Sequence, residues 1–288
     1  MLDRMVDSRI GMLCSGQARA FGARPAQTGS LMFSAVVDMA DGLGRWRTSF
    51  KLALQDVELR YRRSLLGPFW ISAALIATVL ALAYVFANMF HEEFGEHASF
   101  VGAGLLAWYL IVALVNEGSA SITEHAGLLQ NVRMPATTIA GRIVLRNGIV
   151  FLHNLTAMVC LLPFLHTPLS TTALMVFPGA LVILCFGFFL SIALGPLCAR
   201  FRDLPLVIQS GMQVIFFLTP IFWPTSASRP ILSGANPFFH LIELVRAPLL
   251  GHPATTVSWQ VALWCCAGAA VLALISVALT RKRVNLWL

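Results

Sequence analysis

Charged side chains are scarce in this sequence. Only 11% of its 288 residues are Asp, Glu, Lys or Arg, whereas 58% are hydrophobic, and the mean hydropathy is +0.77. A water-soluble globule of this size needs more polar side chains to cover its surface. The composition therefore excludes a soluble globular protein and predicts an all-α integral membrane protein.

Motifs of enzyme chemistry are also missing. The chain has no GxxxxGK[ST] phosphate loop, no HExxH, no GxSxG and no carboxylate-rich metal cluster. The cysteines are scattered without metal-ligand spacing and are expected to be small buried hydrophobes. We therefore expect no catalytic residue, no metal and no cofactor on this chain. If it works as a pump, another subunit must use the ATP and Mg.

Six apolar stretches are long enough to span a membrane, because a bilayer core of about 30 Å needs about 20 residues of helix. The predicted spans are Pro68 to Phe90, Phe100 to Ser121, Arg142 to Leu165, Ala173 to Leu197, Leu204 to Trp223 and Val257 to Thr280. An even number of spans places both termini on one side.

The basic residues indicate which side that is. The formal net charge is +7, and the basic residues cluster beside apolar runs. They lie in the N-terminal region, in the connections between spans two and three and between spans four and five, and in the tail. This pattern is typical of the positive-inside bias and not of nucleic-acid binding. We expect both termini to be cytoplasmic.

The chain enters the membrane at VELRYRRSLLGPFW, residues 57–70. Before this entry, the spacing predicts a helix with an apolar stripe beside a polar row. The stripe is Phe50, Leu54, Val57 and Tyr61, and the row is Lys51, Gln55, Glu58 and Arg62. Such a helix would lie on the bilayer surface or pack against a partner. The predicted regions are a poorly ordered cytoplasmic extension (1–40), this interface helix (41–67) and a six-span domain (68–288).

The segment Pro224 to Val257 alternates helix breakers with apolar pieces of about ten residues, which are too short to span. A re-entrant or interfacial helical hairpin between spans five and six is the better interpretation. Its charged residues Glu243 and Arg246 are three positions apart and would face each other or water.

Two further features suit a transport protein. The loop Ser119 to Arg133 is either a docking element for a soluble partner or a solvated connector, and its candidate residues are Glu124, His125, Gln130, Asn131 and Arg133. Aromatic residues crowd the span ends, as interfacial belt residues do, and a minority would instead line a pathway and stack on sugar rings. The candidates are Trp70, Tyr109, Phe216, Phe217, Phe222 and Trp223.

Four segments together resemble the ABC-2 permeases that export bacterial polysaccharides such as O-antigen, capsule and teichoic acid. They are LRYRRSLLGPFW, NVRMPATT, ARFRDLPLVIQSGMQVIFFLTPIFWP and NPFFHLIELVRAPLLG, in that order. The resemblance covers about Phe50 to the C-terminus.

This resemblance implies a homodimer in the bacterial inner membrane. Two copies of a cytoplasmic ATPase subunit would drive it, and a lipid-linked glycan would be its substrate. The interface helix would be a gate, residues 119–133 would contain the helix that couples to the ATPase, and residues 224–250 would cap the exit. Arg60, Arg62 and Arg63 would bind the lipid pyrophosphate, although they equally suit a positive-inside anchor.

Two alternatives to polysaccharide export remain open at this stage. One is an ABC-2 exporter of drugs or small lipids. The other is a non-transport membrane scaffold or a glycolipid-processing enzyme, against which the missing acid, base or metal set counts.

Overall fold

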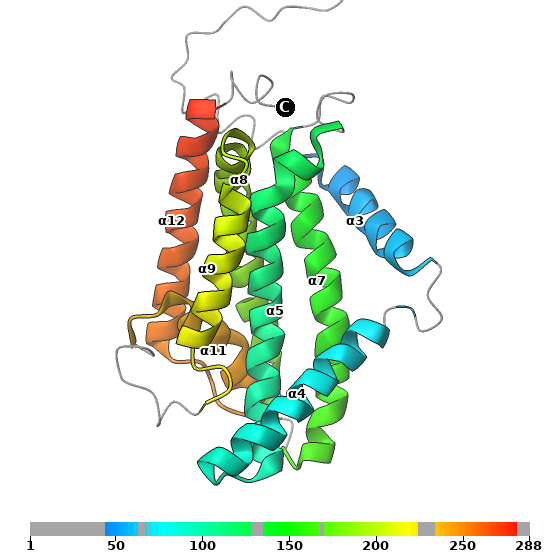
Figure 1. Cartoon of the computed structure of the whole chain (residues 1–288), viewed down its shortest axis with the longest axis vertical. Coiled ribbons are helices and arrows are strands. Elements are labelled where there is room, and N and C mark those ends of the chain that lie inside the picture. The colour runs from blue at the N-terminus through cyan, green and yellow to red at the C-terminus, as the bar shows by residue number, and fades with distance from the viewer. Residues whose placement is uncertain are drawn as a thin grey trace, which may run out of the picture.

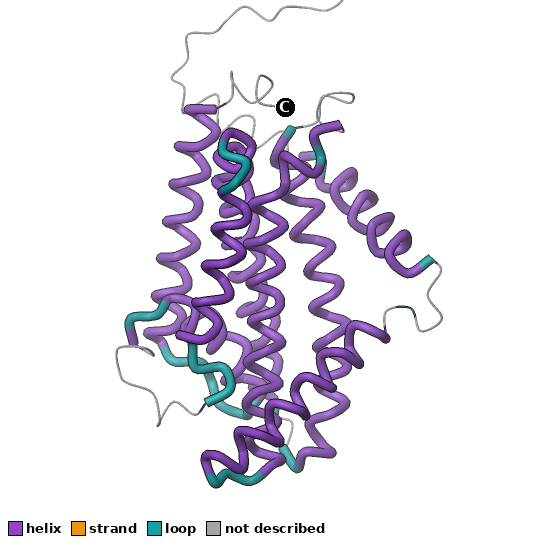
Figure 2. The backbone as a smooth tube through the Cα atoms, in the orientation of Figure 1, coloured by secondary structure: helices purple, strands orange, loops and turns teal. Residues whose placement is uncertain are grey.

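The computed structural model describes residues 44–62, 67, 69–127, 135–167, 170–223 and 234–280. Within these ranges every regular element is a helix, as Figure 2 shows. The predicted extension (1–40) and the basic tail (281–283) lie outside them. The elements in chain order are α3 (Trp46–Tyr61), α4 (Phe69–Phe90), α5 (Phe94–Glu124), α7 (Ala136–Leu161), η1 (Leu162–Leu165), η2 (Thr171–Met175), α8 (Val176–Arg200), α9 (Leu204–Leu218), α11 (Pro237–Leu249) and α12 (Thr256–Thr280).

Five helical stretches are long and apolar enough to cross a membrane. They are Phe69–Phe90, Phe94–Glu124, Ala136–Leu165, Thr171–Arg200 and Thr256–Thr280. They correspond to predicted spans one to four and six, so the prediction of a multi-pass helical membrane protein is confirmed.

The predicted fifth span, Leu204 to Trp223, is only partly helical. Its helix α9 has 15 residues, or about 22 Å, which is less than the bilayer core. The helix stops at Leu218 because Pro220 disfavours a helical conformation at Thr219, whose φ and ψ are −100° and 131°. Residues 219–223 continue without helix.

Helix α5 is the centre of the bundle. Its most apolar 18-residue window is 78% buried, and it packs against α4, α7, α8, α9 and α11 (Figure 1). Glycines allow this close packing, as is common between membrane helices. A Cβ on Gly118 would lie 2.4 Å from Ser191 Oγ, and a Cβ on Gly187 would lie 2.7 Å from Leu114 Cδ1. Both contacts join α5 to α8.

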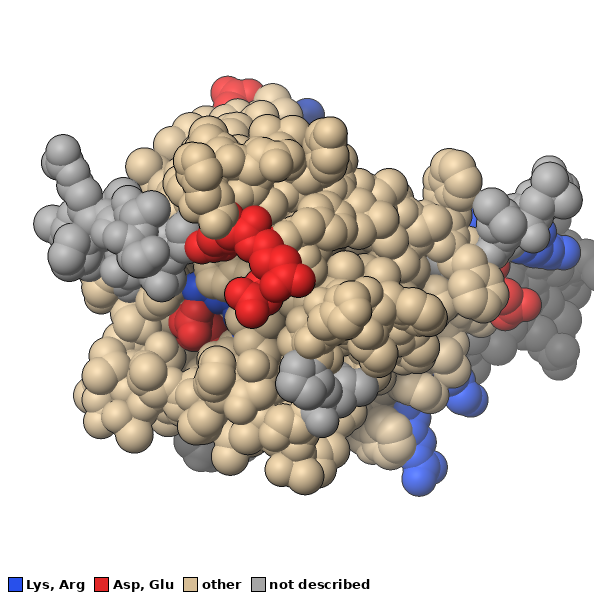
Figure 3. All heavy atoms as spheres, turned by 90° about the horizontal axis from the view of Figure 1, so that it is seen from below, with Lys and Arg blue, Asp and Glu red and all other residues tan. Residues whose placement is uncertain are grey.

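The two ends of the bundle differ in charge. Helix α3 begins, and α12 ends, at the upper end in Figure 1, where α7 begins with Arg142 in its second turn. At the lower end α4 turns into α5 through Glu92 and Glu93, and Figure 3 shows acidic side chains on that face beside a hollow. Helix α5 starts at Phe94 and not at Phe100, so most of the segment between the first two predicted spans is helical.

Candidate functional site

Helix α3 docks on α7 through a narrow face of small and polar residues. Ser49 and Ala53 are buried, and Ser49 Oγ donates a hydrogen bond to the carbonyl oxygen of Thr138 at 3.0 Å. Phe50 and Leu54 of the predicted apolar stripe are 39% and 44% exposed, whereas Val57 of the same stripe is half-buried. Phe50 and Leu54 are therefore accessible for contact with the bilayer surface.

A network of four charged side chains secures this contact. Asp56 of α3 accepts hydrogen bonds from Arg142 Nε at 2.6 Å, from Arg142 Nη2, and from Arg146 Nη1 at 3.4 Å. Arg146 Nη2 also donates to Glu117 of α5, and so does Asn147 Nδ2. The network therefore ties the interface helix to two spans at the upper end of the bundle.

The network favours the ionised form of the Asp56 carboxyl. Burial works against ionisation of Asp56, but the hydrogen bond from Arg142 and the charges of Arg142 and Arg146 outweigh burial and lower the pKa of the carboxyl. At the end of α5, burial and nearby Arg142 lower the pKa of His125, against the effect of its hydrogen bond to Ser121 O and of nearby carboxylates. His125 is therefore a neutral ring beside the ion pairs at pH 7.

The predicted pyrophosphate arginines lie apart from this network. Arg60 and Arg62 are exposed, and neither forms an ion pair with a described residue. Arg63 lies outside the described residues. The pyrophosphate role of Arg60, Arg62 and Arg63 stays a prediction. Arg142 and Arg146 were not among the predicted site residues, because the sequence does not show that these two arginines meet Asp56 of α3.

The predicted coupling residues are described only in part. Glu124 is exposed at the last position of α5, and His125 Nδ1 lies 2.9 Å from Ser121 O. Gln130, Asn131 and Arg133 lie outside the described residues. Because His125 also lies close enough to Asp56 to affect its pKa, the end of α5 is near the docked face of α3.

Four of the six predicted channel aromatics form one cluster. The ring centroids of Phe216 and Phe222 are 5.5 Å apart, those of Phe222 and Trp223 are 4.5 Å apart, and Phe217 contacts both Phe216 and Phe222. Trp108 of α5 lies 5.6 Å from Phe216. Trp70 and Tyr109 are exposed elsewhere. The cluster binds α5 to the end of α9, and the lining role of the six residues stays a prediction.

One face of α5 was not singled out from the sequence. Tyr109, Ala113, Asn116, Ala120 and Thr123 repeat at four- and three-residue intervals, and they include the more accessible residues of this otherwise buried helix. Asn116 Oδ1 is buried and has no hydrogen-bond partner among the described residues. Small and polar residues on one stripe of a membrane helix suit the wall of a hydrated path.

Helix α11 carries the charged pair of the predicted re-entrant segment. Arg246 is 1% exposed; its Nε donates to Glu243 Oε1 at 2.7 Å, and its Nη1 donates to the carbonyl oxygen of Pro220 at 2.6 Å. Its guanidinium carbon lies 4.3 Å from the centre of the Phe100 ring. The two charges therefore face each other, as one of the two sequence interpretations had it. The pair joins α11 to α5 and to the turn after α9.

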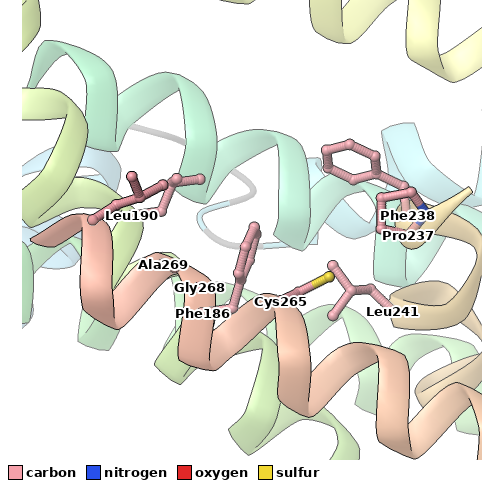
Figure 4. A pocket seen from close by; sticks show the side chains of 9 residues that line it. Phe186, Leu190, Pro237, Phe238, Leu241, Cys265, Gly268 and Ala269 are labelled. Atoms are coloured by element: carbon pink, nitrogen blue, oxygen red, sulfur yellow. The ribbon is translucent and has the colours of Figure 1, made fainter.

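An apolar cavity of about 270 Å³ lies between α8, α11 and α12. Figure 4 shows Phe186 of α8, Leu241 of α11 and Cys265 of α12 around it. Its lining side chains are hydrocarbon or sulfur, so the cavity offers no polar group for binding a sugar or a phosphate.

Comparisons with known proteins add to this geometry. No protein-family model matches the chain. The chain is 26% identical over 207 residues to the O-antigen export system permease protein RfbA of Myxococcus xanthus. The matched residues make up 70% of this chain and 79% of the relative. Two proteins of the same name from Klebsiella pneumoniae are 24% and 23% identical over 59% of the chain and 66% of their own length.

The helical architecture first defines the class: this is a multi-pass membrane protein built from apolar helices. The comparisons then confirm the resemblance inferred from the four sequence segments, since the chain is similar to ABC transporter permeases of O-antigen export systems.

Proposed function

We propose that this chain is the membrane-spanning permease subunit of an ATP-driven exporter that moves a lipid-linked polysaccharide of the O-antigen or capsule type across the bacterial inner membrane. The observation that carries the proposal is the similarity, over up to 70% of the chain, to permeases of O-antigen export systems. The apolar helices supply the membrane domain that this function needs. ATP and Mg belong to a partner subunit, because the chain has no phosphate loop.

In this proposal the chain crosses the membrane six times, with both termini in the cytoplasm. Helix α9 together with residues 219–223 is the additional crossing, and α11 is the second arm of a re-entrant pair. Two observations support it: α3 begins and α12 ends at one end of the bundle (Figure 1), and α11 joins the turn after α9 through Arg246. The acidic end is then periplasmic.

Two copies of the chain would form a homodimer with two ATPase subunits. A long glycan cannot cross hydrocarbon unaided, because each hydroxyl that loses water without a new partner costs about 2–7 kcal/mol. A path between two subunits removes that cost. The stripe of α5 from Tyr109 to Thr123 supplies small and polar residues for the wall of such a path.

Two elements at the cytoplasmic end of the path would have separate tasks. Residues 119–133 would receive the motion of the ATPase, with Glu124 and His125 at the end of α5. Helix α3 would be the gate on the cytoplasmic side. The exposure of Arg60 and Arg62 supports a role for them and Arg63 in binding the lipid pyrophosphate at this gate.

Deletion of the gene tests the proposal. The lipid-linked glycan should accumulate on the cytoplasmic side while surface glycan disappears, and a plasmid copy of the gene should restore the surface glycan. Extracted glycolipid and surface-exposed glycan are measured separately. Normal surface glycan in a clean deletion would contradict polysaccharide export and would favour the alternative exporter of drugs or small lipids.

A further inference from the structure

We propose that Arg142 and Arg146 form a binding site for a diphosphate group, separate from Arg60, Arg62 and Arg63, and that the Asp56 carboxylate fills this site while α3 is docked. The site would open when α3 leaves α7. This inference rests on the proposed export of a lipid-linked glycan, because that substrate carries a diphosphate between its lipid and its sugar.

The first support is the geometry of the arginine pair. Arg142 binds the Asp56 carboxylate with two donors, Nε and Nη2, while Arg146 Nη1 lies 3.4 Å from the same carboxylate. A guanidinium fork binds phosphate oxygens in the same two-donor manner as carboxylate oxygens. The Nε of Arg146 is buried and has no hydrogen-bond partner among the described residues, so the pair has a donor to spare.

The charge balance points the same way. With α3 docked, two guanidinium groups face two carboxylates, Asp56 and Glu117. Without Asp56, Glu117 still pairs with Arg146, but Arg142 loses its only ion-pair partner among the described residues. A partly buried cation without a partner is costly. An anion that replaces Asp56 would remove that cost, and a diphosphate brings more charge and more acceptors than a carboxylate.

Access to the pair depends on α3. The four charged side chains are between 12% and 25% exposed, so water already reaches the network. Apart from these ion pairs, the polar tether of α3 within the described part of the chain is the hydrogen bond from Ser49 to Thr138. Because Phe50 and Leu54 of α3 are exposed, the helix keeps apolar side chains for contact with the bilayer surface after it moves.

Direct binding tests the proposal on the chain purified in detergent with its ATPase partner. The probes are farnesyl diphosphate, farnesyl monophosphate and inorganic pyrophosphate, titrated by calorimetry. Asp56→Asn should tighten the binding of farnesyl diphosphate by about tenfold, since it removes the competing charge. Adding Arg142→Lys and Arg146→Lys should abolish the gain, because lysine keeps the charge but lacks the fork.

The controls separate the possible sources of the anion. Glu58→Gln, on the exposed side of α3, should leave the affinity unchanged. Binding of farnesyl diphosphate above both other probes supports a lipid headgroup. Equal binding of inorganic pyrophosphate would overturn the lipid assignment, and an unchanged affinity in Asp56→Asn would overturn the site.

A disulfide tether gives an independent test that does not change the charges. A Cβ on Gly141 would lie 3.3 Å from Ser49 Cβ, near the 3.5–4.5 Å that a disulfide needs. Oxidised Ser49→Cys/Gly141→Cys should therefore bind farnesyl diphosphate at least about tenfold more weakly than the reduced form. The same affinity in both forms would show that α3 does not cover the site. If cells still export glycan but the affinity changes neither in Asp56→Asn nor on oxidation of the double-cysteine variant, this inference alone is refuted. Normal surface glycan after deletion of the gene would instead refute the proposed function.

Discussion

Replacement of Arg246 by methionine should destabilise the lower end of the bundle. The change removes the hydrogen bonds to Glu243 and to the carbonyl oxygen of Pro220, and it also removes the cation–π contact with Phe100. Methionine fills similar space, so loss of packing contributes little.

The size of the effect depends on the two polar groups that would lose Arg246 as a partner. Glu243, whose side chain is 19% exposed, would lose its cationic partner, and the carbonyl oxygen of Pro220 would lose its donor. Breaking a buried pair from one side costs about 3–5 kcal/mol, and the partial exposure of Glu243 favours about 3 kcal/mol. In a protein of this size that corresponds to a fall of about 6–12 °C in the unfolding temperature.

Thermal unfolding in detergent measures this effect. Glu96→Gln, an exposed acid at the same end, is the matched control and should change little. The double variant Glu243→Gln/Arg246→Met should lose less stability than the sum of the two single variants, because no unpaired charge remains. An unfolding temperature of Arg246→Met equal to that of the wild type would refute the assigned contacts.

Three other predictions concern different parts of the chain. Gly179→Ala should cost about 1–3 kcal/mol in unfolding measurements, because its Cβ would lie 2.4 Å from Leu244 O, whereas Gly268→Ala meets nothing within 4 Å and should be tolerated. Because the folded-state pKa of Asp56 is lowered, its stabilising effect is complete above its usual pKa of 3.8 and is lost as the pH falls through the lower folded-state value. The stability difference between the wild type and Asp56→Asn should thus be constant from about pH 5 to 8 and shrink below about pH 4. Glu124→Lys should lower the glycan exported per ATP hydrolysed without unfolding the protein; unchanged export would make this end of α5 an ordinary connector.

The spans could be predicted from the sequence because hydropathy and length are local properties. The predicted first and last residues of the spans were less accurate where local composition does not reflect the helix that forms. Glu96 and His97 have the composition of a connection, yet they belong to α5, and His97 Nδ1 lies 2.7 Å from Glu92 Oε2. The run from Leu204 to Trp223 is apolar throughout, but Pro220 ends its helix early.

The charge network shows what the sequence does not contain. The helical pattern of α3 separates its apolar stripe from its other faces, but it does not say which face docks. That choice depends on Arg142 and Arg146, which follow Asp56 by 86 and 90 residues. The pairing of Glu117 with Arg146 is likewise a contact between two helices. Only the three-dimensional packing shows that these four charges neutralise one another.

Reconstituted transport tests the central claim most directly. The chain and its ATPase partner are placed in lipid vesicles with an isoprenyl-diphosphate glycan, and ATP is supplied on the side of the ATPase. A membrane-impermeant glycosidase on the opposite side measures how much glycan arrives there. The account predicts glycan that becomes cleavable only with ATP and only with this chain present. ATP hydrolysis by the assembled complex without any movement of glycan would contradict it.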